Sequence, residues 1–172
     1  MVDLDLSANR LVGPIPANIW SMPDLEVVDL HSNDFIGAIP EIESVHDKLF
    51  FFAVQDNNLD WRIPESINKL VNLKHLDISA NNMVMPFPST MGELTNLVAL
   101  FTGINPFEEH PVPEFLSNMR NLRELSMKQN SITGEIPPFL GELTDLQVLD
   151  LDFNQLTGSI PSVSRSQVTC FD

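Results

Sequence analysis

A unit of about 24 residues repeats along the chain, and this repeat limits what the chain can fold into more than any other feature. Each copy carries one asparagine, and the successive spacings are 24, 24, 24, 24, 25 and 24 residues. The seven asparagines are Asn9, Asn33, Asn57, Asn81, Asn105, Asn130 and Asn154. A proline follows each of them seven residues later, or eight in the one copy with an extra residue. Seven copies in register indicate a solenoid, in which each repeat packs against its neighbours.

The last copy shows the expected local structure most clearly. Leu146, Leu149 and Leu151 end in the apolar alternation of a short strand with one buried face. Leu140 and Leu143 are typical of a short helical turn, and the proline at its entry suits the first helical position. Four copies place a glycine four residues after the asparagine, where a turn can use a positive φ: Gly13, Gly37, Gly134 and Gly158.

The repeated asparagine follows the strand where the chain bends inward. Its amide offers two donors and one acceptor, enough to satisfy backbone groups of its own turn and of the neighbouring turn. A buried polar group left unpaired costs about 1–3 kcal/mol. We therefore expect the seven asparagines to form one buried ladder along the solenoid.

Two segments carry a recognisable signature. Residues 5–16 (DLSANRLVGPIP) and 149–161 (LDLDFNQLTGSIP) resemble the plant-type leucine-rich repeat, L-x-x-L-x-L-x-x-N-x-L-x-G-x-I-P. The resemblance implies an α/β fold: a right-handed solenoid with a parallel concave sheet, short 3-10 turns and lateral extended segments. We expect about seven repeats over residues 1–161, the first of them truncated, and the start of a C-terminal cap or tail over residues 162–172.

Both ends of the sequence depart from the repeat. The chain starts inside a repeat at Met1, with no capping sequence ahead of it, and a terminal repeat needs a polar cap over its apolar end. We therefore expect a fragment of a longer protein. Cys170, the single cysteine, forms no internal disulfide and no thiolate metal site alone. It would pair with a cysteine beyond Asp172 or stay a free thiol.

The composition argues against several classes of partner. The chain has 24 acidic and 9 basic residues, a formal net charge of −15. Nucleic acids and anionic membranes are bound through Lys and Arg, so neither is an expected partner. The longest apolar run, residues 49–54, is far shorter than the roughly 18 residues of a membrane helix. No signal peptide is visible. Any membrane attachment would use segments outside this chain.

The outward residues of the predicted strands form columns on the concave face, and apolar groups gather in the third to fifth copies. An apolar cluster with a polar rim is typical of an interaction site, in which aromatic residues dominate the energetics. The candidate concave binding residues are Phe51, Gln55, His75, Phe101, Ile104, Glu124 and Lys128. The alternative is that both phenylalanines merely cover their neighbours and that Ile104 turns inward.

A second anomaly lies on the lateral side. Three successive copies have Trp61, Met85 and His110 where other copies have glycine. Equivalent positions in adjacent repeats lie ~5 Å apart, so these three side chains are expected to be neighbours. Because both anomalies fall in the same copies, one partner contacting both surfaces is the hypothesis. Simple drift of a tolerant loop is the alternative.

The sequence gives no support for catalysis or for a bound cofactor or metal. Asp5 and Asp29 lie in adjacent strands and, joined by Asp3, could hold calcium or act as paired carboxylates. Aspartate is typical of their column, which also carries Asp77 and Asp150, so a solvated acidic column is the expected role. His31 and His75 lie in different columns, too far apart to share a metal. Neither a Gly-rich phosphate loop nor a strained nucleophile turn occurs. We expect no catalytic residue; a kinase domain, if present, would lie outside this chain.

These features favour a recognition module that binds a protein or peptide ligand. The resemblance implies the ligand-binding repeat region of a cell-surface receptor-like protein, on the extracellular side of the membrane and active in signal transduction. The alternatives are a secreted hydrolase inhibitor of the polygalacturonase-inhibitor type and an intracellular scaffold in the cytoplasm. One observation counts against secretion: none of the fifteen asparagines lies in an N-x-[ST] glycosylation motif. Neither the ligand nor the oligomeric state follows from the sequence.

Overall fold

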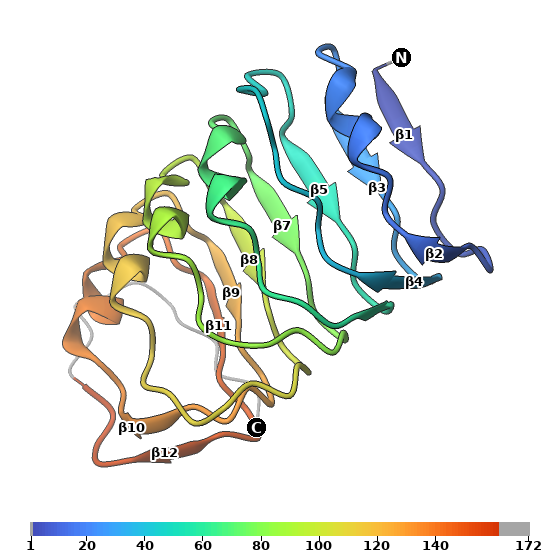
Figure 1. Ribbon diagram of the computed structural model, residues 1–172. Coiled ribbons are helices and arrows are strands. Elements are labelled where there is room, and N and C mark those ends of the chain that lie inside the picture. The colour runs from blue at the N-terminus through green and yellow to red at the C-terminus, as the bar shows by residue number, and fades with distance from the viewer. Residues whose placement is uncertain (1, 162–172) are drawn as a thin grey trace.

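The computed structural model describes residues 2–161 of the 172-residue chain. Figure 1 shows a curved stack of similar coils, with strands on one side and short helical turns on the other. The predicted α/β solenoid is confirmed. The expected C-terminal cap or tail and Cys170 lie outside the described residues.

The concave face is a parallel sheet of seven strands, arranged in chain order because each repeat adds one strand beside the last. Its strands are β1 (Asp3–Asp5), β3 (Val27–Asp29), β5 (Phe51–Ala53), β7 (His75–Asp77), β8 (Ala99–Phe101), β9 (Glu124–Ser126) and β11 (Val148–Asp150). Equivalent repeat positions pair directly, as in Phe51 opposite His75 and His75 opposite Ala99. The columns read from the 24-residue spacing are therefore the columns of the sheet.

Short 3-10 helices line the opposite side of five repeats. They are η1 (Ala17–Ser21), η2 (Glu65–Lys69), η3 (Ser89–Glu93), η4 (Glu114–Asn118) and η5 (Pro138–Glu142). The repeat proline was expected at the first helical position. It occupies instead the N-cap position, one residue before the helix. Pro137, for example, has φ −66° and ψ 140°, an extended conformation that its fixed φ also favours.

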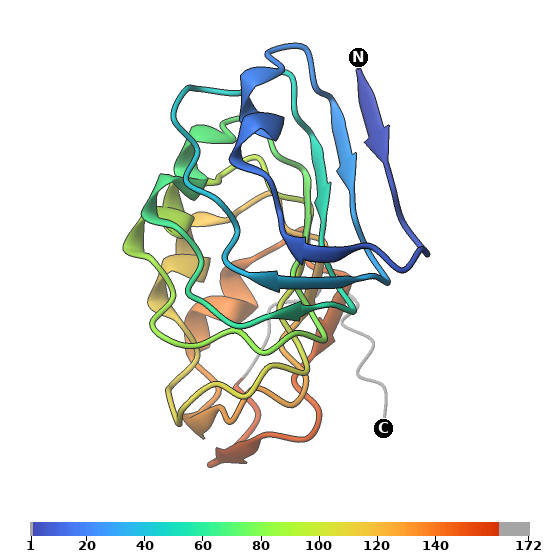
Figure 2. The same cartoon turned by 45° about the vertical axis from the view of Figure 1, so that its right-hand side comes forward.

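Lateral strands connect the two sides, as Figure 2 shows for β2 and β4. The first lateral sheet contains β2 (Val12–Pro14), β4 (Asp34–Gly37) and β6 (Asn58–Leu59). The second pairs β10 (Thr133–Glu135) with β12 (Gln155–Thr157). In the lateral segments between them, residues 82–87 and 106–112, the described chain forms no strand but only an isolated bridge, from His110 to Ile132. The lateral strands are thus interrupted in the fourth and fifth copies, both of which lack the glycine.

The inner side of each coil forms one continuous core. The central residue of each interior concave strand is fully buried or nearly so, as are the leucines before it. Phe52 replaces the usual aliphatic residue in β5 and is completely buried, with Trp20 packed edge-on against it at 5.6 Å between ring centroids. Each repeat buries its apolar face only by stacking on the next, which is why the sequence period and the fold period coincide.

The repeated asparagines hydrogen-bond adjacent coils. Asn33 Nδ2 donates to the carbonyl oxygens of Leu6 and Leu30 at 2.9 and 3.1 Å, and its Oδ1 accepts from the Leu11 amide at 2.9 Å. Asn57, Asn81 and Asn105 repeat this pattern. Asn9, however, is exposed rather than buried, because the structure places no coil on its outer side.

Asn130 also departs from the ladder. Its Nδ2 donates to Thr102 Oγ1 at 2.7 Å, and its buried Oδ1 has no partner among the described residues. In other repeats the asparagine Oδ1 accepts from a backbone amide of the previous repeat, two residues after that repeat's own asparagine, as Asn57 Oδ1 accepts from the Phe35 amide. Here that amide belongs to Phe107 and donates to the Asn105 carbonyl at 2.9 Å instead. Pro106 lies between them with its φ restricted, which favours such a tight turn.

Candidate functional site

An aromatic row lies on the concave face and consists of Phe51, His75 and Phe101. The rings of Phe51 and His75 stack, with 4.3 Å between centroids and 10° between planes. His75 and Phe101 are 5.4 Å apart and tilted by 49°. The small, buried Ala99 stands directly opposite His75, and the Phe101 ring approaches from the adjacent column. The structure therefore joins three of the predicted binding residues into one half-buried surface.

Acidic groups surround this row. Burial lowers the pKa of His75, while the carboxylates of Asp77, Glu124 and Asp29 oppose that shift. Burial likewise raises the pKa of Asp77, against two hydrogen bonds from Ser79 to Asp77 Oδ1, at 2.9 Å from the amide and 2.6 Å from the hydroxyl. The uncharged imidazole thus presents a flat aromatic face beside the carboxylates of the rim.

The other predicted concave residues lie around the row. Gln55 is half-buried and Glu124 is exposed. Lys128 is engaged by the last repeat: its Nζ lies 3.5 Å from Asp152 Oδ2 and 5.0 Å from the centroid of the Phe153 ring. The Phe153 ring is 69% exposed and is therefore available for contact; the sequence prediction did not include it, although it shares a column with Ile104.

Ile104 does not turn inward. Its side chain is 46% exposed, and its φ is 57°, a left-handed conformation that is rare for a β-branched residue. Every copy has a positive φ at this position, so the turn of the solenoid imposes the conformation. Ile104 lines a hollow of about 320 Å³ together with Pro106 and Gln129.

The three lateral residues do not form one surface. Trp61 is 64% exposed, Met85 is half-buried against the core, and His110 is only 8% exposed. The expectation that His110 belongs to the lateral binding surface is therefore wrong. Its ring packs edge-on against Phe87 at 5.7 Å between centroids, and its Nδ1 lies 2.7 Å from the carbonyl oxygen of Pro111. The loop with the extra residue folds this histidine inward.

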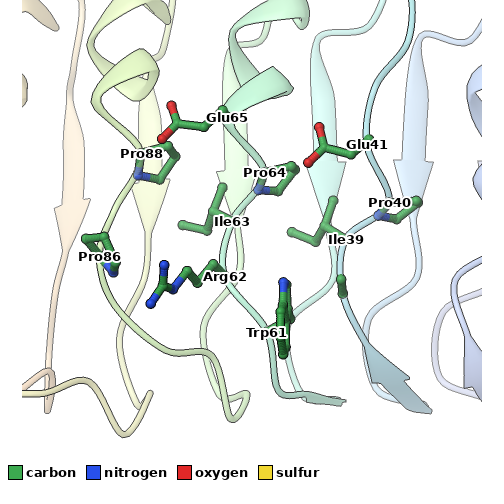
Figure 3. Close-up of a pocket in the computed structure, with 11 residues that line it drawn as sticks. Ile39, Pro40, Glu41, Trp61, Arg62, Ile63, Pro64, Glu65, Pro86 and Pro88 are labelled. Carbon is green, nitrogen blue, oxygen red and sulfur yellow. The ribbon is translucent and has the colours of Figure 1, made fainter.

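A groove of about 380 Å³ opens beside Trp61 (Figure 3). Ile39 and Ile63 lie between its proline walls, and Glu41 and Glu65 extend along one rim. Arg62 extends on the side of Pro86. No residue lining this groove belongs to the concave row. The two surfaces predicted to contact one partner therefore share no lining residue.

The acidic column consists of individually capped carboxylates. Asp5 Oδ1 accepts from both the amide and the hydroxyl of Ser7, which lowers the pKa of Asp5, and Asp29 Oδ1 lies 2.7 Å from His31 Nδ1. Within residues 2–161, no three His, Cys, Asp or Glu side chains cluster as metal ligands would. No helix in the same range is long and apolar enough to cross a membrane.

Comparisons with known proteins agree with the repeat signature. Residues 48–164 match the family model described as leucine-rich repeat region. The chain is 35% identical over 163 residues to receptor-like protein 35 of Arabidopsis thaliana, covering 94% of this chain and 17% of that protein. It is 32% identical over 69 residues to Arabidopsis receptor-like protein 48, covering 40% of this chain and 8% of that protein.

Solved structures show the same likeness. The ectodomain of the Arabidopsis receptor kinase HAESA, in complex with an N-terminally extended IDA peptide hormone, superimposes with a TM-score of 0.88 at 34% identity. The match covers 94% of this chain and 27% of that chain. The plant peptide hormone receptor RGFR1 in complex with RGF2 superimposes with a TM-score of 0.86 at 33% identity, and the match covers 93% of this chain and 26% of that chain. The chain spans less than a fifth of the length of the curated relatives it matches. The chain belongs to the leucine-rich-repeat family, and its repeats are similar to those of plant receptor-like proteins.

Proposed function

We propose that this chain is part of the ligand-binding ectodomain of a plant cell-surface receptor, and that it binds a peptide or protein segment on its concave face. The observation that carries the proposal is the continuous row of Phe51, His75 and Phe101. Aromatic rings bury much apolar area with little loss of conformational freedom, so such a row is suited to anchor a ligand.

Two further observations support this proposal. The similar structures of HAESA and RGFR1 are receptor chains in complex with peptide hormones. Glu124, opposite Ala99 in the sheet, is exposed beside the row, and its carboxylate can accept hydrogen bonds from a peptide backbone. Binding would take place on the extracellular side of the membrane, and the chain would act through recognition rather than catalysis.

One observation favours a second candidate, an intracellular scaffold. None of the fifteen asparagines lies in an N-x-[ST] motif, although secreted domains commonly carry such motifs on their surface. The hydrolase-inhibitor alternative has no comparable observation in its favour. The three roles differ in the source of the ligand: extracellular fluid for a receptor, cytoplasm for a scaffold, and a secreted hydrolase for an inhibitor.

Site-specific photo-crosslinking tests the proposal. A benzophenone amino acid replaces Phe101 in one variant and the exposed Val12, on the lateral β2 strand, in a matched control. Each variant is irradiated in extracellular fluid and, separately, in cytosolic extract from plant tissue. We expect position 101 to capture a defined peptide or protein from extracellular fluid and position 12 to capture none. Capture by position 12 alone, or only from cytosol, would contradict the receptor proposal.

A further inference from the structure

The lateral groove beside Trp61 arises from a specific change in the repeat. Four copies have glycine at this position, each with a positive φ between 77° and 91°. The third copy has a tryptophan instead, whose side chain is 64% exposed. The first lateral sheet ends at β6, just before Trp61, so no ordinary lateral strand covers the indole on the following repeat. Trp61 lines a second hollow together with Val84, which is 41% exposed, so the indole is part of an exposed apolar patch, and such patches mark interaction sites.

The floor and walls of the groove are apolar and regular. Ile39 and Ile63 are 2% and 5% exposed and lie at equivalent positions in adjacent copies. Pro40, Pro64 and Pro88 succeed one another along the wall at intervals of one repeat. Figure 3 shows these prolines in a row, with the isoleucines between them and the Trp61 indole below the row, on the side away from Glu41 and Glu65. The groove is thus an extended channel rather than a round cavity.

Two carboxylates occupy equivalent places on one rim, and both are held by the next coil. Ser66 Oγ donates to Glu41 Oε2, and Thr90 Oγ1 donates to the Glu65 carbonyl oxygen at 2.7 Å and lies 3.3 Å from Glu65 Oε2. In Figure 3 both glutamate side chains project on the same side of the proline row. The guanidinium of Arg62 extends at the opposite side and can donate hydrogen bonds to carbonyl oxygens. The rim is therefore complementary to a positively charged side chain.

We propose that this groove binds a basic, proline-rich segment of another protein in the polyproline II conformation. Such a helix has a fully unpaired backbone, so its carbonyl oxygens are free to accept from Arg62, and grooves lined by aromatic rings are its common receptors. The segment places a proline or leucine against Trp61 and a lysine or arginine between Glu41 and Glu65. Three repeats at ~5 Å spacing cover ~10 Å, the length of about three residues of this helix.

This inference is independent of the proposed function. The groove shares no lining residue with the concave row, and its occupant is a basic segment rather than the ligand of the aromatic row. A receptor with both surfaces would hold its ligand on one face and a second protein on the side. Failure of either surface to bind leaves the test of the other unaffected.

Fluorescence anisotropy with a labelled synthetic peptide of sequence PPRPLPRPP tests the groove on the 172-residue chain. Two companion peptides replace arginine by glutamate or proline by alanine. We expect Trp61→Ala to weaken binding about tenfold. Glu41→Gln and Glu65→Gln should each weaken it about threefold, as expected for partly exposed ion pairs. Val12→Ala and Glu135→Gln are the matched controls, because both residues are exposed on lateral strands outside the groove.

The expected pattern is weakened binding in the groove variants, unchanged binding in both controls and in Phe101→Ala, and an unchanged melting temperature throughout. Both companion peptides should bind the unaltered chain more weakly than PPRPLPRPP does, which would support recognition of both arginine and proline. The proposal is overturned if PPRPLPRPP binds no better than either companion, or if Trp61→Ala binds it as well as the unaltered chain does.

Discussion

The imidazole of His75 lies flat against the ring of Phe51, 4.3 Å from centroid to centroid, on the concave face of the solenoid. The two residues stand one repeat apart in sequence and directly opposite each other in adjacent strands. Stacking removes water from one face of the imidazole, which favours its neutral form. The contact therefore links the geometry of the proposed binding surface to its protonation.

The protonation of His75 gives a first prediction. The Asp77 carboxylate raises the pKa of His75 against the lowering effect of burial, so Asp77→Asn should lower that pKa further. Asparagine keeps an oxygen that can accept the hydrogen bonds from Ser79. Titration of the His75 ring resonances by NMR measures the shift. Asp150→Asn, in the same column of the sheet at its far end, is the control and should leave the titration unchanged.

The free energy of unfolding should also depend on the protonation of His75. Because the folded pKa of His75 lies below its unfolded value of 6.5, the unfolded chain binds the proton first as pH falls. The free energy of unfolding should therefore decrease as pH drops below 6.5, toward the lower folded pKa. His75→Phe keeps an aromatic ring and should reduce this decrease. Urea unfolding at several pH values checks it; an identical pH slope in both proteins would exclude His75 as a source.

The asparagine ladder gives a second prediction. Asn81→Ala removes the acceptor for the Leu59 amide and the donor to the Val54 carbonyl, both buried, and should cost about 1–3 kcal/mol. Asn9→Ala is the matched control, since Asn9 is exposed and its Nδ2 bonds only within its own turn. Chemical denaturation measures both. Equal midpoints for the two variants would mean that burial of the ladder contributes little.

A third prediction concerns the left-handed backbone at Ile104. A non-glycine residue in this region costs roughly 1–2 kcal/mol, while asparagine is tolerated there. Because the Ile104 side chain is already 46% exposed, Ile104→Asn should raise the free energy of unfolding by about 1 kcal/mol. Val84→Asn is the control, because Val84 is similarly exposed, at 41%, and is absent from the positive-φ positions. If both changes destabilise equally, packing of Ile104 outweighs its strain.

Much of the architecture was predictable because the repeat period is also the period of packing. A 24-residue spacing places Phe51 opposite His75 without any knowledge of the structure, and the strand alternation directs both rings outward. Phe101 lies in the next column and reaches His75 because the residue opposite His75, Ala99, is small. Spacing within a single column does not predict this contact between columns.

The fifth copy was less predictable because its path depends on one extra residue. Pro106 brings the Phe107 amide onto the Asn105 carbonyl, which leaves Asn130 Oδ1 without its usual donor among the described residues. The same loop turns His110 into the core, between aromatic rings. The 24-residue period predicts side-chain positions only where it is unbroken. The extra residue breaks it before His110, so the prediction that His110 lies on the surface was wrong.

The concave aromatic row is the central claim, and calorimetry of variants with the peptide captured at position 101 tests it most directly. Truncation of a buried aromatic anchor typically costs ~2 kcal/mol of binding, or roughly thirtyfold in affinity. We predict such a loss for Phe101→Ala with the fold intact, and a change of less than about twofold for Asp5→Ala and Asp150→Ala, at the two ends of the sheet. Unchanged binding by Phe101→Ala, with a large loss in either aspartate variant, would place the site on the acidic column and contradict the account.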